Sequence, residues 1–186
     1  MSCVNDTFLF LCVLLPQVIL EVVGAADRFG FVELKNALVL ILSSFVSLDN
    51  VIPLLIHSDT YHLPELYTKC LCFIEDKANT MKVLQSSAFL YLPEENLIQI
   101  ISQDTLVAPE LAIFKAVVQW KEHNSSSAEQ MARVLQHIRL GELSLQEIFN
   151  EVEPTGLFSQ DSIMAALRLQ STPCIIESQG RGRKGM

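Results

Sequence analysis

Residues 92–120 have the sequence LPEENLIQIISQDTLVAPELAIFKAVVQW, which contains two helix starts of the same kind. Leu92-Pro93-Glu94 and Ala108-Pro109-Glu110 each place a proline directly before a glutamate, and Leu63-Pro64-Glu65 repeats this order upstream. Proline suits the first turn of a helix, because the N–H that it lacks would have no partner there. The glutamate that follows lies near the positive end of the helix dipole. Each triplet therefore predicts the beginning of a helix.

Apolar residues recur at helical spacing after these starts, so that each segment has one apolar face. We expect four such faces: Leu97, Ile100 and Ile101; Ile113, Phe114, Val117 and Trp120; Met131, Val134, Leu135 and Ile138; and Leu145, Ile148, Phe149 and Val152. The single tryptophan lies on one of these stripes, which favours a role in core packing over ligand stacking.

Helix boundaries can be placed elsewhere in the chain as well. Gly30 predicts a stop between a helix over about 17–29 and another over about 32–46. Ser159 is the expected N-cap of a last helix over about 160–169. The chain has no Asn-Gly hairpin signal and no sustained alternation of apolar and polar residues, which strands require. The short connections favour antiparallel neighbours, so the predicted fold is all-α, with stacked antiparallel helical hairpins.

Composition narrows the classes of partner. The 186 residues are 50% hydrophobic and 18% charged, with a formal net charge of −8. Nucleic-acid binding needs a positive field, and the one basic cluster is Arg181, Arg183 and Lys184 in a glycine-rich tail. We therefore expect no nucleic-acid partner, and we expect the tail over 172–186 to be disordered.

No arrangement of residues indicates catalysis, a metal or a cofactor. His57 and His62 are five apart without the glutamate spacing of metalloproteases, and no glycine-rich phosphate loop or nucleophile motif occurs. The five cysteines include no CxxC pair, which favours reduced, mostly buried thiols and a cytoplasmic protein. The expectation is a protein that binds other proteins and is not an enzyme.

The amino terminus leaves an alternative open. Residues 7–20 are almost wholly apolar, but the charge that precedes them is Asp6 and no lysine or arginine is present, unlike a signal peptide. Glu21 ends the run before it reaches the ~20 apolar residues that a spanning helix needs. We therefore treat residues 1–17 as an apolar leader of unknown role and expect no membrane partner. The alternative is a secreted or membrane-tethered helical protein that uses this segment.

Residues 83–93, VLQSSAFLYLP, resemble the beginning of the BACK domains of BTB–BACK proteins. The similarity continues through the helix that contains Glu110, Phe114 and Trp120, and then through residues 133–140. Upstream, residues 25–34 resemble the last helix pair of a BTB domain, and residues 50–74 resemble the "3-box" helix pair that joins BTB to BACK. The resemblance covers about residues 18–171.

The resemblance implies an organisation and a function. Residues 18–76 would be the C-terminal BTB helices plus the 3-box, and residues 77–171 the BACK domain. The chain would be a non-enzymatic adaptor segment of a cullin-3 ubiquitin-ligase substrate receptor, without the BTB core. Because the 3-box helps to hold cullin-3 in this family, the candidate cullin-facing residues are Val51, Leu54, Leu55 and Tyr61; the alternative is that these four side chains pack on the neighbouring hairpin. A further alternative is a defective copy with no independent activity.

The helix expected near residue 40 has an unusual surface. Ala37 to Val46 contains five successive aliphatic residues, 38–42, so that this helix is apolar on all sides. Such a helix is normally buried all round. Without a BTB core one side would lie bare, and we therefore expect the isolated chain to self-associate or to bind a hydrophobic dye.

Overall fold

In the computed structural model, the described residues are Pro16 and residues 18–171, and they form helices and turns without any strand. The predicted all-α class is confirmed. The chain divides into two compact units, residues 1–138 and 139–186, and each is described separately. The expected disorder of the tail and most of the apolar leader fall outside the residues that can be described.

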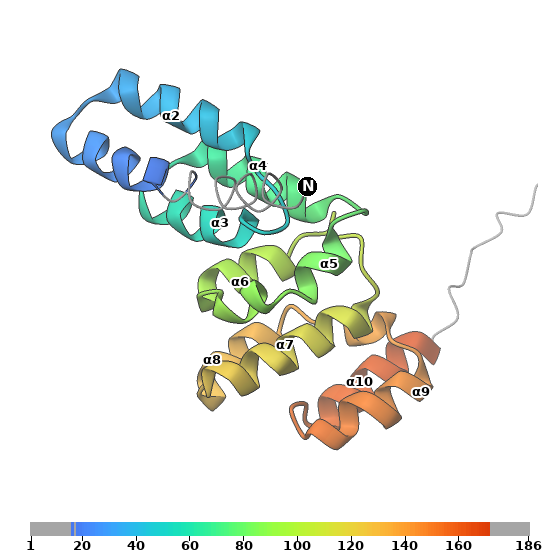
Figure 1. The fold of residues 1–186 in the computed structure, drawn as a ribbon. Helices are drawn as coiled ribbons and strands as arrows, with labels where there is room; N and C mark the ends of the chain where they lie inside the picture. The colour runs from blue at the N-terminus through green and yellow to red at the C-terminus, as the bar shows by residue number, and fades with distance from the viewer. Residues whose placement is uncertain (1–15, 17, 172–186) are drawn as a thin grey trace, which may run out of the picture. The chain divides into compact units, whose positions relative to one another are not determined.

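The first unit is a succession of helices joined by short turns (Figure 1). A helix over 18–29 comes first. The elements that follow in chain order are α2 (Val32–Ser44), α3 (Val51–Thr60), α4 (Pro64–Glu75), α5 (Thr80–Leu84), a 3-10 helix (Ser87–Tyr91), α6 (Glu94–Ile101), α7 (Glu110–Asn124) and α8 (Ala128–Leu135).

The predicted helix boundaries hold closely in this unit. Gly30 has a φ of +73°, the left-handed conformation that ends the first helix before α2. Pro64 is in the first turn of α4, as expected. Pro93 and Pro109 instead stand just before their helices, at the N-cap, so that Glu94 and Glu110 are the first helical residues.

In the first unit, α7 packs against the preceding 3-10 helix. Trp120 is buried, and its indole Nε1 donates a hydrogen bond to the backbone oxygen of Leu92 at 2.8 Å. Asn124 at the end of α7 donates from Nδ2 to the backbone oxygen of Leu90 at 2.8 Å. These bonds fasten α7 to the 3-10 helix, in which Phe89 is fully buried, and to the connection that follows it.

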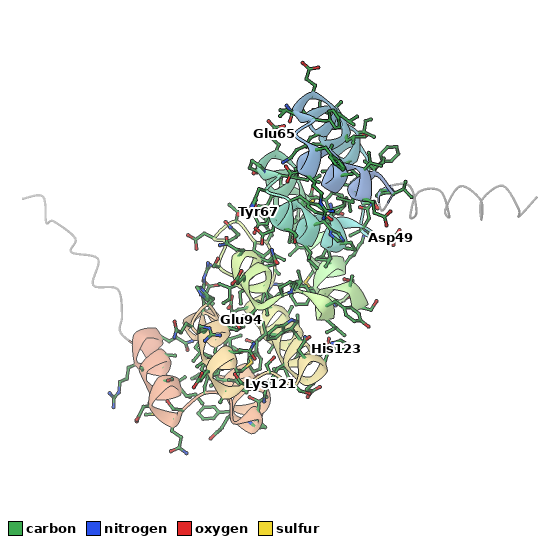
Figure 2. All side chains as sticks on the ribbon, turned by 90° about the vertical axis from the view of Figure 1, so that its left-hand side faces the viewer. Asp49, Glu65, Tyr67, Glu94, Lys121 and His123 are labelled. Atoms are coloured by element: carbon green, nitrogen blue, oxygen red, sulfur yellow. The ribbon has the colours of Figure 1, made fainter. Side chains whose placement is uncertain are left out.

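Two polar links hold the neighbouring helices in place. Arg133 on α8 donates from Nε and Nη2 to the two carboxylate oxygens of Glu94 on α6, at 2.6 and 3.0 Å. The hydrogen bond and charge of Arg133 lower the pKa of Glu94. Tyr67 on α4 shares a hydrogen bond with the buried Asn96 on α6, and burial raises the pKa of Tyr67. Both Tyr67 and Glu94 are labelled in Figure 2.

The second unit contains a 3-10 turn (Leu140–Glu142), α9 (Leu145–Glu147), a π-helical turn (Ile148–Val152), a 3-10 turn (Glu153–Thr155) and α10 (Gln160–Ser171). Ser159 caps α10 as predicted, because its Oγ accepts a hydrogen bond from the backbone nitrogen of Ser162. Gln170 on α10 donates from Nε2 to the backbone oxygens of Gly141 and Leu143, at 3.0 and 2.7 Å.

One predicted apolar face in this unit is wrong. Of its four members, Ile148 and Val152 are fully buried, whereas Leu145 and Phe149 are 55% and 51% exposed. The physical reason is the π-helical turn, which is wider than an α-turn and shifts residues out of the 3.6-residue spacing. Ile148 and Val152, four residues apart within this turn, therefore face the core, and Leu145 and Phe149 face outward.

The helix with apolar residues on every side is α2, and one of its sides is bare in the described structure. Val39 and Leu42 are buried, while Leu40 and Ile41 between them are 67% and 43% exposed. Leu34 and Phe45 extend the exposed apolar surface toward the two ends of the helix. Among the described residues this side of α2 is uncovered, as expected from the sequence, and the expected self-association stays a prediction.

Candidate protein-interaction site

In the turn between α3 and α4, the backbone geometry leaves the rings of Tyr61 and His62 accessible at the surface. His62 has a φ of +52°, which is left-handed. The backbone nitrogen of Leu63 donates to the oxygen of Ser58 at 2.8 Å, and that of His62 donates to the oxygen of Asp59 at 3.1 Å. This pair of bonds is the Schellman arrangement that ends a helix, and the buried Leu63 supplies its apolar contact. The chain therefore reverses direction at this turn and continues directly into α4, which begins at Pro64.

The four residues that the resemblance suggested as cullin-facing differ in their burial. Val51, Leu54 and Leu55 are at most 1% exposed and belong to the core of the α3–α4 hairpin. Tyr61 is half-buried and lies at the turn. Of these four side chains, only that of Tyr61 has an accessible surface for a partner. The role of these four residues in binding stays a prediction.

The Tyr61 ring is held from two sides. It stacks on His57 one turn earlier, with ring centroids 6.0 Å apart and planes 12° from parallel. On the other side it packs against Gly24 in the first helix, where an added methyl group would lie 3.1 Å from the ring. Glycine at this position allows the close approach of helix and ring. Tyr61 is therefore a positioned aromatic group rather than a freely rotating one.

Two shallow hollows lie on either side of this turn. One of about 300 Å³ is lined by the Tyr61 ring and by residues of the first helix: Glu21, Gly24, Ala25, Arg28 and Phe29. The other, of about 260 Å³, is lined by His62, Pro64 and Glu65 from the turn and α4, and by Asp27, Lys35 and Asn36 among others from the first two helices. We call the Tyr61–His62 turn and these two hollows the turn site.

Lys35 on α2 contacts both the first helix and the turn between α3 and α4. Lys35 Nζ lies 2.6 Å from a carboxylate oxygen of Asp27, and it also donates to the backbone oxygen of Tyr61 at 3.3 Å. The Lys35 side chain is 19% exposed, so that its apolar stem is largely covered. Sequence reasoning missed this contact, because Asp27 and Lys35 are separated by the Gly30 turn and no motif connects them.

The chemistry of the turn site suits binding more than reaction. Its polar groups are of both signs, and most of them are exposed, among them Glu65 on α4, which is labelled in Figure 2. Within the described residues, no three His, Cys, Asp or Glu side chains converge to hold a metal ion. An aromatic ring, an arginine and apolar hollows are the features that protein interfaces favour.

Comparison with known proteins gives the family of this helical chain. The model of the BACK family, "BTB And C-terminal Kelch", matches residues 51–153, and the chain belongs to this family. The matched range begins with α3 and so includes the α3–α4 hairpin. The resemblance drawn from the sequence is thereby confirmed.

Individual relatives agree with the family. The chain is 34% identical over 166 residues to BTB/POZ domain-containing protein 9 of Bos taurus, a match that covers 89% of this chain and 26% of that protein. The protein of the same name from Drosophila melanogaster is 32% identical over 153 residues, 82% of this chain and 21% of its own length. Kelch-like protein 6 of Homo sapiens is 29% identical over 146 residues, 77% and 23%. The chain spans about a quarter of the length of these relatives.

The family is one of protein-interaction adaptors, which agrees with the expectation of a binding function. In the part of the chain that is described, no helix has both the length and the apolarity needed to cross a bilayer. The alternative based on the apolar segment 7–20 concerns residues that lie mostly outside the described part.

Proposed function

We propose that this chain is part of a substrate receptor of a cullin-3 ubiquitin ligase, acts in the cytoplasm, and contacts the cullin through the turn site. The observation that carries the proposal is the BACK-family match, which extends over the α3–α4 hairpin and the ordered aromatic turn at its tip. Residues 18–76 would then correspond to the C-terminal BTB helices plus the 3-box, and residues 77–171 to the BACK domain.

The physical role of such a segment is spacing. Packed helices whose turns are held by hydrogen bonds keep two binding surfaces at a fixed distance from each other. A bound substrate is thereby kept at a high effective concentration near the ligase. The first unit has the required stiffness: Trp120 and the Glu94–Arg133 pair fasten consecutive helices to one another. No catalytic group is needed for this role.

The burial of the three aliphatic residues refines the proposed contact. Val51, Leu54 and Leu55 would support the hairpin from within, and Tyr61 with Arg28 would meet the partner. Tyrosine and arginine combine large contact area with directional hydrogen bonds, which is why they recur among residues that dominate binding energy. We expect their loss to weaken cullin binding about tenfold or more, which corresponds to ~1.4 kcal/mol.

Co-precipitation of the full chain with cullin-3 from cells tests the proposal, with a BTB-complete relative as the positive control. Arg28→Glu reverses an exposed charge without removing core packing, and it should reduce recovery of cullin-3. Tyr61→Ala should do the same. Tyr91→Ala is the matched control, because Tyr91 is a 67% exposed aromatic residue of the same unit outside the turn site.

The outcomes separate the alternatives. Loss of binding in the two turn-site variants, with Tyr91→Ala unaffected, supports the proposal. If the unmodified chain recovers no cullin-3 while the relative does, the proposed function is wrong and a copy without independent activity is favoured. Equal binding by all variants would place the contact elsewhere on the chain.

A further inference from the structure

The bare side of α2 carries a regular apolar stripe. The stripe consists of Leu34, Leu38, Ile41 and Phe45, which are spaced by four, three and four residues. This spacing places them along one side of the helix, as in helices that pack lengthwise against a partner. None of the four is buried, and Leu34 and Ile41 are 46% and 43% exposed. Together these four side chains leave roughly 250–300 Å² of apolar surface uncovered, which is close to the size of patch that marks an interaction surface.

The described chain begins beside one end of this stripe. Pro16 is buried and lines a small hollow together with Leu20, Asn50 and Leu54. Asn50 in turn donates from Nδ2 to the backbone oxygen of Phe45, the last residue of the stripe, at 2.8 Å. The segment that precedes Pro16 is therefore attached close to the carboxyl end of α2.

That segment has a composition matched to the stripe. Residues 8–15 are FLFLCVLL, eight consecutive apolar residues without a charge. The stripe of α2 also contains no charged residue. Bringing the two together would remove apolar surface from water and would desolvate no ion.

We propose that residues 8–15 lie along the Leu34–Phe45 stripe of the same chain and cover it. The attachment at Pro16 makes the contact intramolecular, with an effective concentration on the order of millimolar for a short tether. At micromolar protein concentration, a tethered segment is favoured over the same contact from a second copy by roughly a hundredfold or more. This inference does not depend on the proposed cullin contact.

The attachment point also sets the direction of the contact. Residue 15 would lie near Phe45, and earlier residues would lie progressively closer to Leu34. Three residues span about 5 Å in a helix and about 10 Å in an extended chain. Cys12 is therefore within one or two helical turns of Phe45 in either conformation, which is the level of Ile41 and Leu38.

Cross-linking of Cys12 in the full chain tests this placement. In a background with Cys3→Ser, Cys72→Ser and Cys174→Ser, the remaining second thiol is Cys70, which is fully buried. With Ile41→Cys added, a short bis-maleimide should join positions 12 and 41 within one chain, as identified by peptide mass at the mass of a monomer. Asn36→Cys is the matched control, because it is exposed on the same helix but lines the hollow beside α4.

A second measurement reports on coverage. The double variant Leu11→Ser, Leu14→Ser should raise the fluorescence of a hydrophobic dye severalfold and should bring out the self-association expected from the sequence. Val4→Ser, outside the apolar run, should leave both unchanged. Far-UV circular dichroism confirms that each variant is folded.

Three results would overturn the proposal. A cross-link at 36 as efficient as at 41 would show that the segment has no fixed place on α2. A cross-linked species with the mass of a dimer would assign the stripe to a second copy. Unchanged dye fluorescence in the double variant would show that residues 8–15 do not cover the stripe. None of these outcomes bears on cullin-3 binding, so the two proposals can fail independently.

Discussion

Replacing Trp120 with phenylalanine should destabilise the first unit substantially. The change removes the hydrogen bond from indole Nε1 to the backbone oxygen of Leu92, which is itself buried. The loss of a buried donor costs about 1–3 kcal/mol. The smaller ring also leaves part of a packed site empty, which adds about 1 kcal/mol or more. We expect the free energy of unfolding to fall by roughly 2–4 kcal/mol, a large part of the ~5–15 kcal/mol typical of a domain.

Urea unfolding followed by far-UV circular dichroism measures this change, because the variant has no tryptophan for fluorescence. With a slope of about 1–3 kcal/mol per molar urea, the midpoint should fall by about 1 M or more. Gln119→Ala is the control: it is exposed on the same turn of α7 and should change stability by less than ~0.5 kcal/mol. A loss below ~1 kcal/mol for Trp120→Phe would refute the assignment of this indole as the link between α7 and the preceding connection.

Three further measurements test other contacts. Gly24→Ala should be more favourable in a Tyr61→Ala background than in the unmodified protein by about 0.5–1 kcal/mol, because the added methyl group meets the tyrosine ring at 3.1 Å; equal effects in both backgrounds would contradict the packing. Burial raises the pKa of Cys70 to about 12, so this thiol should resist iodoacetamide at pH 8 until urea is added, whereas the exposed Cys72 should react at once; native modification of Cys70, read by peptide mass, would count against the core. Ser127→Ala removes the capping box of α8 and should lower the free energy of unfolding by about 1 kcal/mol, and no loss of stability in urea would argue that this helix end is held by other contacts.

Helix positions and the core face of α7 could be predicted from local sequence. Gly30 and Pro64 act through their own backbone, and so their effects on helix ends do not depend on distant residues. Trp120 could be assigned to the core because its neighbours on the 3.6-residue repeat are also apolar. The same repeat failed at Phe149, since nothing in the local sequence distinguishes a π-helical turn from an α-helical one.

The candidate site depended on tertiary structure. Val51, Leu54, Leu55 and Tyr61 are all apolar or aromatic, and an apolar side chain serves equally well in a core or in an interface, so their sequence could not separate the buried three from the accessible one. The Lys35 contacts likewise join different helical elements, because Asp27 lies across the Gly30 turn and the Tyr61 backbone is 26 residues further along the chain. Local preferences are set by each residue and its neighbours, and they determine where helices begin and end. Which faces of those helices stay open to a partner is set by how the helices pack, and only the folded chain decides it.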